Sequence, residues 1–186
     1  MDIQAFIQLS CGHWFTQRTC HQLGQFTSEA QTAQLEINAL KLNVPDVVCL
    51  CEAARIDPDL ALCAARVSWQ SQGFQLQPSE DGMLLMVPFA SDAAGQQGQL
   101  LQQESHGPIS QLNFHIDSEQ RLVLTGSKDQ MVLEERVWFA SPNLRLRISL
   151  LKQSGQLYQA TWYSEVRMGG LPASDPTEIA ATASTP

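Results

Sequence analysis

A two-residue alternation of apolar and polar side chains runs through most of this chain and constrains its fold more than any other feature. After His13, the side chains of Trp14, Thr16, Arg18 and Cys20 fall on one face, and the odd-numbered residues from 15 to 23 fall on the other. Successive side chains of a β-strand point to opposite faces, so this period predicts a long strand beginning at His13.

Segments of the same kind recur as far as residue 168. Turn signals such as Ser141-Pro142-Asn143 and Ser154-Gly155 separate them. The pattern predicts nine further strands, at residues 34–40, 66–69, 83–87, 99–103, 109–116, 121–125, 131–139, 144–152 and 157–168. About ten consecutive strands joined by short turns are typical of an antiparallel up-and-down barrel. We therefore expect a mainly β fold that closes around a cavity, and the cavity is the natural site.

Three short segments carry helix-start signals instead. Asp2 stands at an N-cap position before a helical pattern that ends near Gly12. Pro45 and the Asp57-Pro58 pair each place a proline in a first helical turn, and Asp57 supplies an N-cap for the second. The sequence thus predicts an N-terminal helix and two short helices between the early strands, from Pro45 to Cys63.

Length and composition indicate one folded unit. The 186 residues are 44% hydrophobic and 16% charged, which is ordinary for a globular chain with one well-buried core. We expect a single domain over residues 1–168. Residues 169–186 are rich in Gly, Pro, Ala, Ser and Thr and lack apolar periodicity, so we expect them to form a disordered tail.

The sequence and its composition also indicate the cellular compartment and exclude some kinds of partner. No segment is apolar and long enough to span a bilayer, and no signal-peptide pattern follows Met1. A formal net charge of −8 would repel phosphate backbones, so nucleic acid is not an expected partner. The cysteines form an odd set without disulfide-scaffold spacing, which favours a reducing, cytoplasmic location: Cys11, Cys20, Cys49, Cys51 and Cys63.

Residues 145–149 hold the most informative group of charges. Arg145, Arg147 and Ser149 alternate with apolar residues, so two guanidinium groups and a hydroxyl point the same way. Guanidinium groups pair bidentately with carboxylates, so this strand could hold an anionic ligand inside a barrel. A solvated outer face explains the same alternation equally well, because alternation does not say which face points inward.

Two glutamates on neighbouring predicted strands could complete such a site. Glu135 and Glu165 could each neutralise the arginines or accept a hydrogen bond from a ligand N–H group. The run Glu134-Glu135-Arg136 is also typical of a surface ion-pair cluster, and the sequence favours that interpretation of Glu135.

Other candidate site residues are Arg18, His21 and the tryptophans. Strict alternation places Arg18 and His21 on opposite faces unless a bulge intervenes. A histidine can transfer protons near neutral pH, although a structural role is more common. A tryptophan such as Trp69 is more often a core residue, yet a flat conjugated ligand would need such a wall. The Cys49-x-Cys51 pair on a helix would point its thiols apart, so no metal site is expected.

Four blocks of sequence stand out together. They are SCGHWFTQRTCHQL at 10–23, IDP at 56–58 followed by ARVSW at 65–69, EERVWFASPNLRLR at 134–147, and SEVRMG at 164–169. In this order, and over about residues 1–170, the chain resembles the S/U-type phycobiliprotein lyases of cyanobacteria and related algae. The resemblance implies a lipocalin-like or fatty-acid-binding-protein-like barrel.

The resemblance also implies an activity and a set of contacts. Such proteins bind a linear tetrapyrrole, here phycocyanobilin or a similar bilin, and deliver it to a cysteine of a phycobiliprotein subunit as a thioether. It implies no metal and no further cofactor, because the bilin is the substrate. The residues implied to contact the bilin are Arg18, His21, Trp69, Glu135, Arg145, Arg147, Ser149 and Glu165.

Roles within that set follow from the chemistry of a bilin. The arginines would hold propionate groups, Glu135 or Glu165 would accept hydrogen bonds from pyrrole N–H groups, and Trp69 would pack against a ring. Addition of the acceptor thiolate to an ethylidene carbon requires a proton on the ring, so His21 and Glu135 are the expected catalytic residues.

Two other functions are compatible with the same barrel. One is a non-catalytic bilin carrier, and the other is a structural partner of the antenna complex. The resemblance is also compatible with a homodimer or with a complex containing a related lyase subunit.

Overall fold

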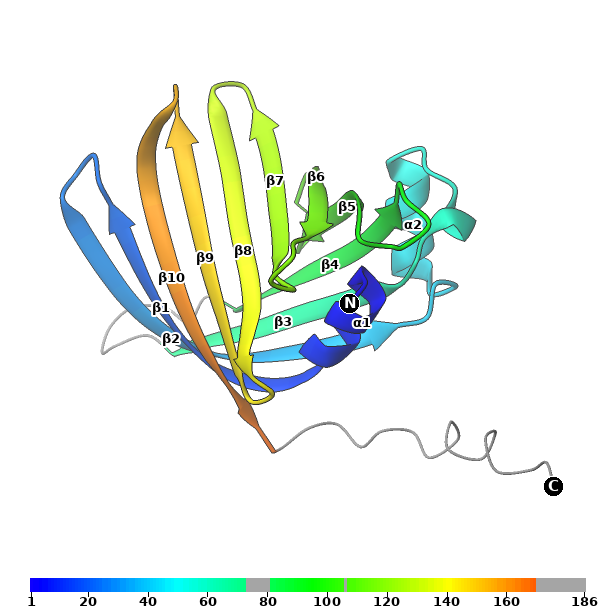
Figure 1. Cartoon of the computed structure of the whole chain (residues 1–186), viewed down its shortest axis with the longest axis horizontal. Helices are drawn as coiled ribbons and strands as arrows, with labels where there is room; N and C mark the ends of the chain where they lie inside the picture. The colour runs from blue at the N-terminus through cyan, green and yellow to red at the C-terminus, as the bar shows by residue number, and fades with distance from the viewer. Residues whose placement is uncertain (73–80, 106, 170–186) are drawn as a thin grey trace.

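Ten antiparallel strands close into one barrel in the computed structural model, which describes residues 1–72, 81–105 and 107–169 (Figure 1). Each strand pairs with its neighbours along the chain, and β1 pairs with β10 to close the barrel. The strands are β1 Gly12–Gln22, β2 Thr27–Leu40, β3 Ala64–Gln72, β4 Asp81–Ala90, β5 Gln97–Glu104, β6 Ile109–Ile116, β7 Leu122–Lys128, β8 Met131–Ser141, β9 Leu144–Gln153 and β10 Gln156–Met168. The predicted ten-stranded up-and-down barrel is confirmed.

The observed strands follow the predicted segments, and the largest difference is at β2. This strand begins at Thr27 and not at residue 34. Residues 27–33 are polar and small and are exposed or only partly buried, so they carry no alternation for a sequence pattern to detect. Pairing with β1, from Gly12 opposite Ile37 to Gln22 opposite Thr27, holds them in the sheet.

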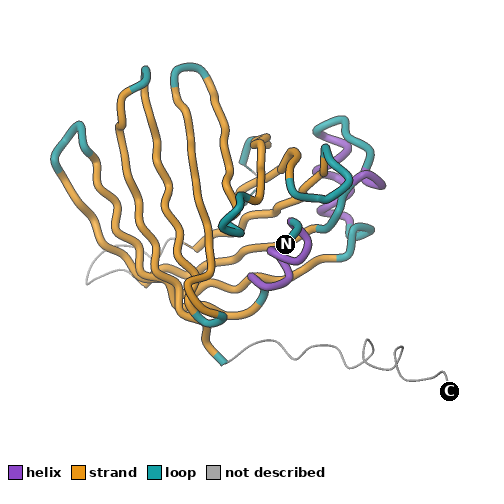
Figure 2. Tube along the Cα trace, in the orientation of Figure 1, coloured by secondary structure: helices purple, strands orange, loops and turns teal. Residues whose placement is uncertain are grey.

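The predicted helices also form. In α1 (Ile3–Ser10), the Asp2 carboxylate accepts a hydrogen bond of 2.8 Å from the Ala5 N–H, as an N-cap should. The second predicted region gives α2 (Pro45–Ala53) and a single 3₁₀ turn, η1 (Pro58–Leu60), which Asp57 caps. Figure 2 shows α1 lying across one end of the barrel and α2 on its outside.

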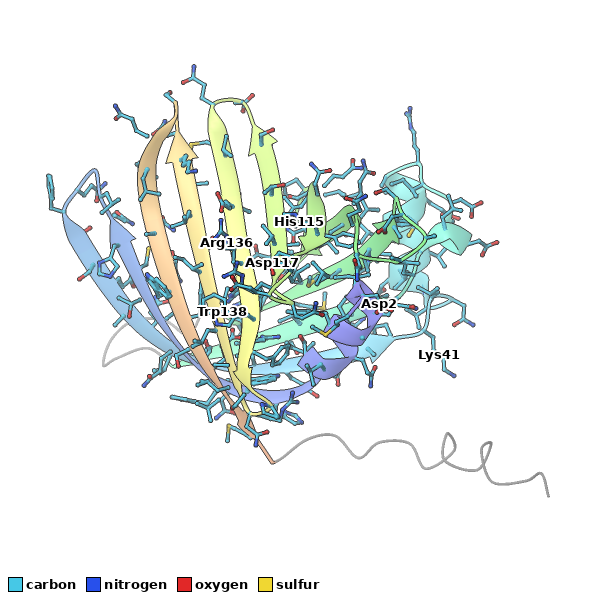
Figure 3. The ribbon with its side chains drawn as sticks, viewed as in Figure 1. Asp2, Lys41, His115, Asp117, Arg136 and Trp138 are labelled. Carbon is cyan, nitrogen blue, oxygen red and sulfur yellow. The ribbon has the colours of Figure 1, made fainter. Side chains whose placement is uncertain are left out.

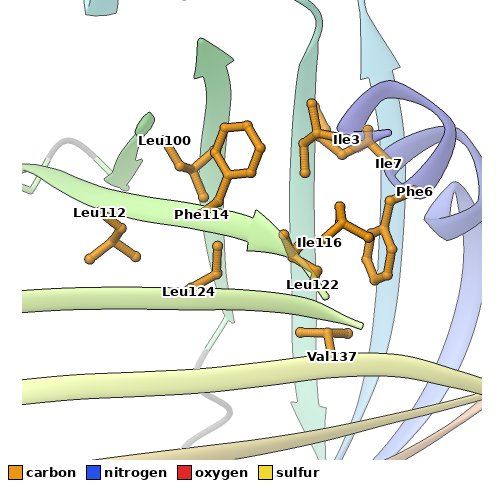
Figure 4. Close-up of a cluster of buried hydrophobic side chains, with 11 residues drawn as sticks. Ile3, Phe6, Ile7, Leu100, Leu112, Phe114, Ile116, Leu122, Leu124 and Val137 are labelled. Atoms are coloured by element: carbon orange, nitrogen blue, oxygen red, sulfur yellow. The ribbon is translucent and has the colours of Figure 1, made fainter. Parts of the chain in front are cut away.

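The apolar core fills the end of the barrel where α1 lies. Figure 4 shows Ile3, Phe6 and Ile7 of α1 packed with side chains of β5 to β8, among them Phe114 and Val137. Because α1 has one apolar face, it closes this end of the barrel. The space that remains lies towards the other end.

A second apolar cluster lies outside the barrel, between α2 and the outer face of β4 and β5. It includes Val47 and Leu50 of α2 and Leu85 and Val87 of β4. This cover explains why consecutive residues of β4 are apolar, since both faces of that strand are buried.

Three further sequence predictions concern the C-terminal tail, the cysteines and membrane-spanning segments. Of the predicted disordered tail, only Gly169 lies within the described residues. All five cysteines are free thiols. Within the described residues, no helix is both long and apolar enough to cross a membrane.

Candidate functional site

The barrel encloses a cavity of about 670 Å³ that is apolar on one side and charged on the other. A volume of this size suits a small-molecule ligand or a cofactor-sized substrate. Apolar side chains contributed by β2, β3, β4, β6, β7 and β8 line one part, namely Leu35, Ile37, Ala65, Val67, Leu84, Met86, Leu112, Leu122, Leu124, Leu133 and Val137. Charged and polar residues of β1, β8, β9 and β10 line the other part.

Arg145 and Arg147 of β9 both line the cavity, so the inward direction of this strand face is established. Arg145 is buried, and its Nε donates a hydrogen bond of 2.5 Å to Oε2 of Glu165. Glu165 faces Arg145 directly across the β9–β10 pairing and has no exposed surface. A buried carboxylate needs such a partner, because transfer of an unpaired charge out of water is strongly unfavourable.

Arg147 lies between two carboxylates and an aromatic ring. Its guanidinium nitrogens are 3.8 Å from Glu135 and 3.6 Å from Glu165, and its Cζ lies 3.6 Å from the centre of the Tyr163 ring. Burial alone would lower the pKa of Arg147, but the charges of Glu135 and Glu165 raise it above its ordinary value. Arg147 is therefore a permanent cation at the cavity wall.

Glu165 is held as an anion by the same arrangement. Burial raises the pKa of a carboxyl group, but here the charges of Arg145 and Arg147 and the hydrogen bond from Arg145 lower the pKa of Glu165 below 4.5. The glutamate therefore neutralises part of the arginine charge without taking up a proton near neutral pH.

Several polar atoms of this wall have no hydrogen-bond partner among the described residues. They are Thr16 Oγ1, Arg18 Nε, Arg147 Nε and Glu165 Oε1. Unpaired buried polar atoms are unfavourable by about 1–3 kcal/mol each, so such a group indicates a ligand or water that would satisfy them. Thr16, Arg18 and Arg147 line the cavity and Glu165 does not, so a ligand that brings hydrogen-bond acceptors would lie beside the first three of these groups.

Trp14 and Arg167 support this wall from beneath. Trp14 is fully buried, and the guanidinium carbons of Arg145 and Arg167 lie 5.0 and 4.1 Å from the centre of its ring. Arg167 donates to the backbone carbonyls of Leu9, Cys11 and Pro142. Burial and the nearby charge of Arg145 lower the pKa of Arg167. Arg167 thus joins the end of α1 to the β8–β9 turn, directly behind Arg145.

Trp69 and Arg18 extend the wall around the cavity. Trp69 of β3 lies opposite Gly82 of β4, and a Cβ atom at position 82 would lie 2.2 Å from its indole ring. A glycine is needed there because the ring lies against the backbone. Arg18 of β1 donates a 3.0 Å hydrogen bond to the side chain of Gln31 on β2, and both residues line the cavity.

Two carboxylates line the cavity on the side away from the arginines. Asp81 begins β4 and Glu104 ends β5, and both are exposed. In the closed barrel, β4 and β5 lie across from β9 and β10. The cavity is therefore polarised, with guanidinium groups on one wall and carboxylates on the opposite rim.

Glu135 lines the cavity, while its two neighbours face outward. The prediction that Glu134-Glu135-Arg136 forms a surface ion-pair cluster is confirmed only for Glu134 and Arg136, which are joined at 2.6 Å. Figure 3 shows Arg136 and Trp138 on the outer face of β8. Glu135 belongs to the other face and pairs with Arg147.

Two further predicted site residues, His21 and Ser149, are not among the described residues that line the cavity. His21 is exposed on β1, on the face opposite to that of Arg18, and the pairing of β1 with β2 and β10 shows no bulge that would turn it inward. Ser149 is half-buried on the same face of β9 as Arg145 and Arg147, and it pairs with Glu135 of β8. The structure therefore groups Ser149 with the arginines, as the alternation predicts, and places His21 on the other face.

Comparison with known proteins identifies the family. The family model described as "CpeS-like protein" matches residues 2–168. The chain belongs to the CpeS-like protein family. This CpeS-like chain is 37% identical over 171 residues to the "Chromophore lyase CpcS/CpeS" of Thermosynechococcus vestitus, across 91% of the chain and 94% of that relative. It is 29% identical to the "Phycocyanobilin lyase subunit CpcS" of a Picosynechococcus species, across 93% of the chain and 89% of the relative.

A solved structure shows the same fold. The S-type phycobiliprotein lyase CPES from Guillardia theta superposes with a TM-score of 0.79 and 23% identity, covering 94% of the CpeS-like chain and 95% of the other. The family model and the curated relatives confirm the family resemblance inferred from the four sequence blocks, and this structure confirms the fold that it implied.

Sequence reasoning missed several residues of the wall. Thr16 and Tyr163 carried a usable signal, because each is two residues from a predicted site residue on the same strand face, Arg18 and Glu165 respectively. Asp81 and Glu104 carried none, since both lie at strand ends outside the predicted segments. Across the described residues, no group of His, Cys, Asp or Glu side chains is placed to hold a metal ion.

Proposed function

We propose that this protein is a chromophore lyase that binds a linear tetrapyrrole in the barrel and promotes its thioether attachment to a cysteine of a phycobiliprotein subunit. The observation that carries the proposal is the polarised cavity, with Arg145 and Arg147 on its charged wall facing an apolar wall, in a chain of the CpeS-like family. The names of the relatives support the activity, and one of them supports phycocyanobilin or a similar bilin as the substrate.

The cavity matches the parts of a bilin. Its propionates would face the guanidinium groups of Arg145 and Arg147, with Arg18 in the same register as Arg147, two strands away. Its pyrrole rings would lie along the apolar part, with Trp69 against one of them. The pyrrole N–H groups would donate to Glu135, which lines the cavity. Glu165 is fully buried beside Arg145 and Arg147 and is not among the residues that line the cavity, so it would act on the bilin through these two arginines. Each ligand group has a partner of the right chemistry in the described wall.

The bond-forming step is an addition without a leaving group. The sulfur of the acceptor thiolate forms a bond to the ethylidene carbon, the electron pair of the C=C bond moves into the conjugated system, and a proton returns to the ring. Glu135 is the side chain that we assign to this proton, since it lines the cavity while His21 lies outside it. The larger contribution of the protein is positioning, because a bound, oriented bilin exposes one carbon to one thiol.

The partners follow from this reaction. The bilin enters as the substrate, and we propose no metal and no further cofactor. The acceptor is a phycobiliprotein subunit, and the compartment is the cytoplasm. One relative is named a lyase subunit, which supports assembly with a related lyase chain over a homodimer.

An attachment assay tests the proposal. The purified protein is mixed with phycocyanobilin and an apo-phycobiliprotein subunit, and the acceptor is separated under denaturing conditions. We expect the acceptor to gain covalent colour at least about tenfold faster than without the protein, as expected for an oriented reaction. A carrier without catalytic function would bind the bilin but leave the rate and the site of attachment unchanged, and that result would refute the proposal.

A further inference from the structure

Exposed apolar side chains gather along one strand of this barrel. Nine large hydrophobic side chains in the described part of the chain are exposed, and two of these, Leu60 and Val132, lie elsewhere. The other seven lie on β10 or at the β1–β2 turn beside it. We name them the β10 patch: Leu23, Phe26, Leu157, Tyr158, Trp162, Val166 and Met168.

The pairing of the strands joins these residues into one surface. The Leu23 N–H donates to the carbonyl of Tyr158 at 3.0 Å, so the β1–β2 turn lies against the start of β10. Trp162, Val166 and Met168 belong to the outward face of β10, with only Ser164 between them. Tyr158 lies at the irregularity between Leu157 and Gln159, where it is exposed beside the β1–β2 turn.

The neighbouring outward face of β9 is apolar as well. Ile148 lies beside Trp162, and Leu146 lies beside Ser164. No charged side chain occupies an outward position between Leu144 and Leu150 on β9 or between Tyr158 and Met168 on β10. In a chain of net charge −8, two adjacent strands without an outward charge are a marked departure from a solvated face.

The outer face of β4 is apolar as well, but there a helix covers the apolar side chains. The outward apolar residues of β4, such as Leu85 and Val87, are covered by α2 and are buried. Nothing in the described chain covers Trp162, Val166 and Met168, each of which is 49% exposed. Aromatic and methionine side chains without charges are typical of the centre of a protein–protein interface.

The patch begins at the open end of the cavity. Arg18 and Gln31 are a paired couple that lines the cavity, and the β1–β2 hairpin continues for four further pairs, to Gln22 opposite Thr27. At about 3.3 Å per residue, its turn therefore projects about 13 Å beyond Arg18. Figure 1 shows the β1–β2 and β9–β10 turns on the same rim, away from α1. Phe26, 97% exposed, stands on this rim.

We propose that the β10 patch is the surface on which the acceptor protein docks. This inference rests on the proposed function, since an acceptor that must bring its cysteine to a bilin in the cavity has to cover the open rim. The occupant that fits is a protein whose apolar surface flanks the reacting cysteine. A docking surface for a transient acceptor must also tolerate exposure between turnovers, and Ala160 and Ser164 interrupt the apolar row on the outward face of β10.

Substitutions at the two most exposed aromatic positions test the proposal. The variants are Phe26→Asn and Trp162→Ser, and the controls are Leu60→Ser and Val132→Ser, which remove exposed apolar side chains outside the patch. Phe26 has a positive φ of 52°, which asparagine tolerates well, so the first variant should fold. Bilin binding by each variant is measured from its absorption, and attachment is measured against the concentration of apo-acceptor.

The predicted result is a selective loss of acceptor recognition. Each patch variant should bind bilin as the wild type does, reach the same maximal rate, and need about tenfold more acceptor for half that rate, as when one interface anchor is removed. The controls should change neither value. Absence of attachment by the wild type would instead refute the proposed function.

Two results would overturn the docking proposal while the proposed function stands. The first is an unchanged dependence on acceptor concentration in both patch variants. The second is a shift of the patch variants from dimer to monomer in sedimentation, with unchanged acceptor dependence, since the patch would then be an interface between copies of this chain.

Discussion

At the residue scale, the cavity wall depends on carboxylates that fix the arginines. Glu165 is completely buried, yet it remains ionised because Arg145 and Arg147 contact it from the next strand. Removal of one member of a buried ion pair leaves an uncompensated charge, which destabilises by about 3–5 kcal/mol. The glutamate therefore holds the guanidinium groups in place for a ligand, and its effect should depend on pH.

Substitution of Glu165 should remove an acid-dependent part of the stability. Because the pKa of Glu165 is lower in the folded state, its contribution is fully present above pH 4.5 and is lost as the pH falls through the folded-state value. In urea unfolding, Glu165→Gln should be less stable than the wild type at pH 7, and the difference should shrink below pH 4.5. Glu52→Gln, at an exposed position of α2, is the matched control. A difference that stays constant between pH 7 and pH 3 would contradict the assignment.

Gly82 should determine where the Trp69 ring lies. A methyl group at position 82 would overlap the indole by a wide margin, since its Cβ would be 2.2 Å from the ring. We expect Gly82→Ala to displace Trp69, shift its fluorescence and weaken bilin binding about tenfold, while Gly24→Ala, where a Cβ would meet Tyr158 at an ordinary contact distance of 3.9 Å, changes neither. A shifted fluorescence with unchanged bilin affinity in Gly82→Ala would show that Trp69 takes no part in the site, and an unchanged fluorescence would contradict the claim that Gly82 determines where the ring lies.

At the element scale, α1 and the β8–β9 turn are joined by one buried cation. Arg167 donates to carbonyl groups of Leu9, Cys11 and Pro142, and its side chain contacts Trp14. Gly12 is part of the same junction, because its φ of +123° favours glycine and a Cβ there would lie 2.9 Å from Arg167. The closed end of the barrel thus depends on a few residues near both ends of the folded chain.

Arg167→Met should destabilise the barrel by about 2–4 kcal/mol, because buried carbonyl groups lose charge-assisted hydrogen bonds. Arg136→Met removes a surface ion pair of β8 and should change the stability by less than about 1 kcal/mol. Chemical unfolding followed by circular dichroism gives both values. Equal stability of the two variants would refute the role of Arg167.

The sequence predicts a strand where one of its faces is apolar and buried and the other is polar and exposed. Residues 13–22 alternate because one face contacts the cavity and the core, whereas residues 27–33 of β2 contribute only polar or small side chains such as Gln31 to the cavity and gave no signal. Alternation grouped Arg145 with Arg147 but could not say which way they point. The contact between Arg145 and Glu165 depends on the β9–β10 register, which shifts near Leu157, and no local pattern predicts that shift.

At the scale of the whole molecule, the closed barrel separates two tasks. One end is filled by α1 and the apolar core, and in the part of the chain that the structure describes the barrel opens at the other end. The walls carry cations on one side and exposed carboxylates on the opposite rim, which would orient a ligand with acidic groups at one edge. A lyase must orient its bilin in this way before the thiol is added. A carrier needs only to bind the bilin.

The most direct test compares a bilin with its dimethyl ester, which lacks the propionate charges. Affinities for both are measured by absorption titration with the wild type, with Arg147→Ala, and with Arg136→Ala as the control on the outer face of β8. The wild type and the control should prefer the free acid by about tenfold or more, and Arg147→Ala should lose most of this preference. An Arg147→Ala protein that folds normally and still prefers the free acid as strongly as the wild type would contradict the arginine wall as the propionate site.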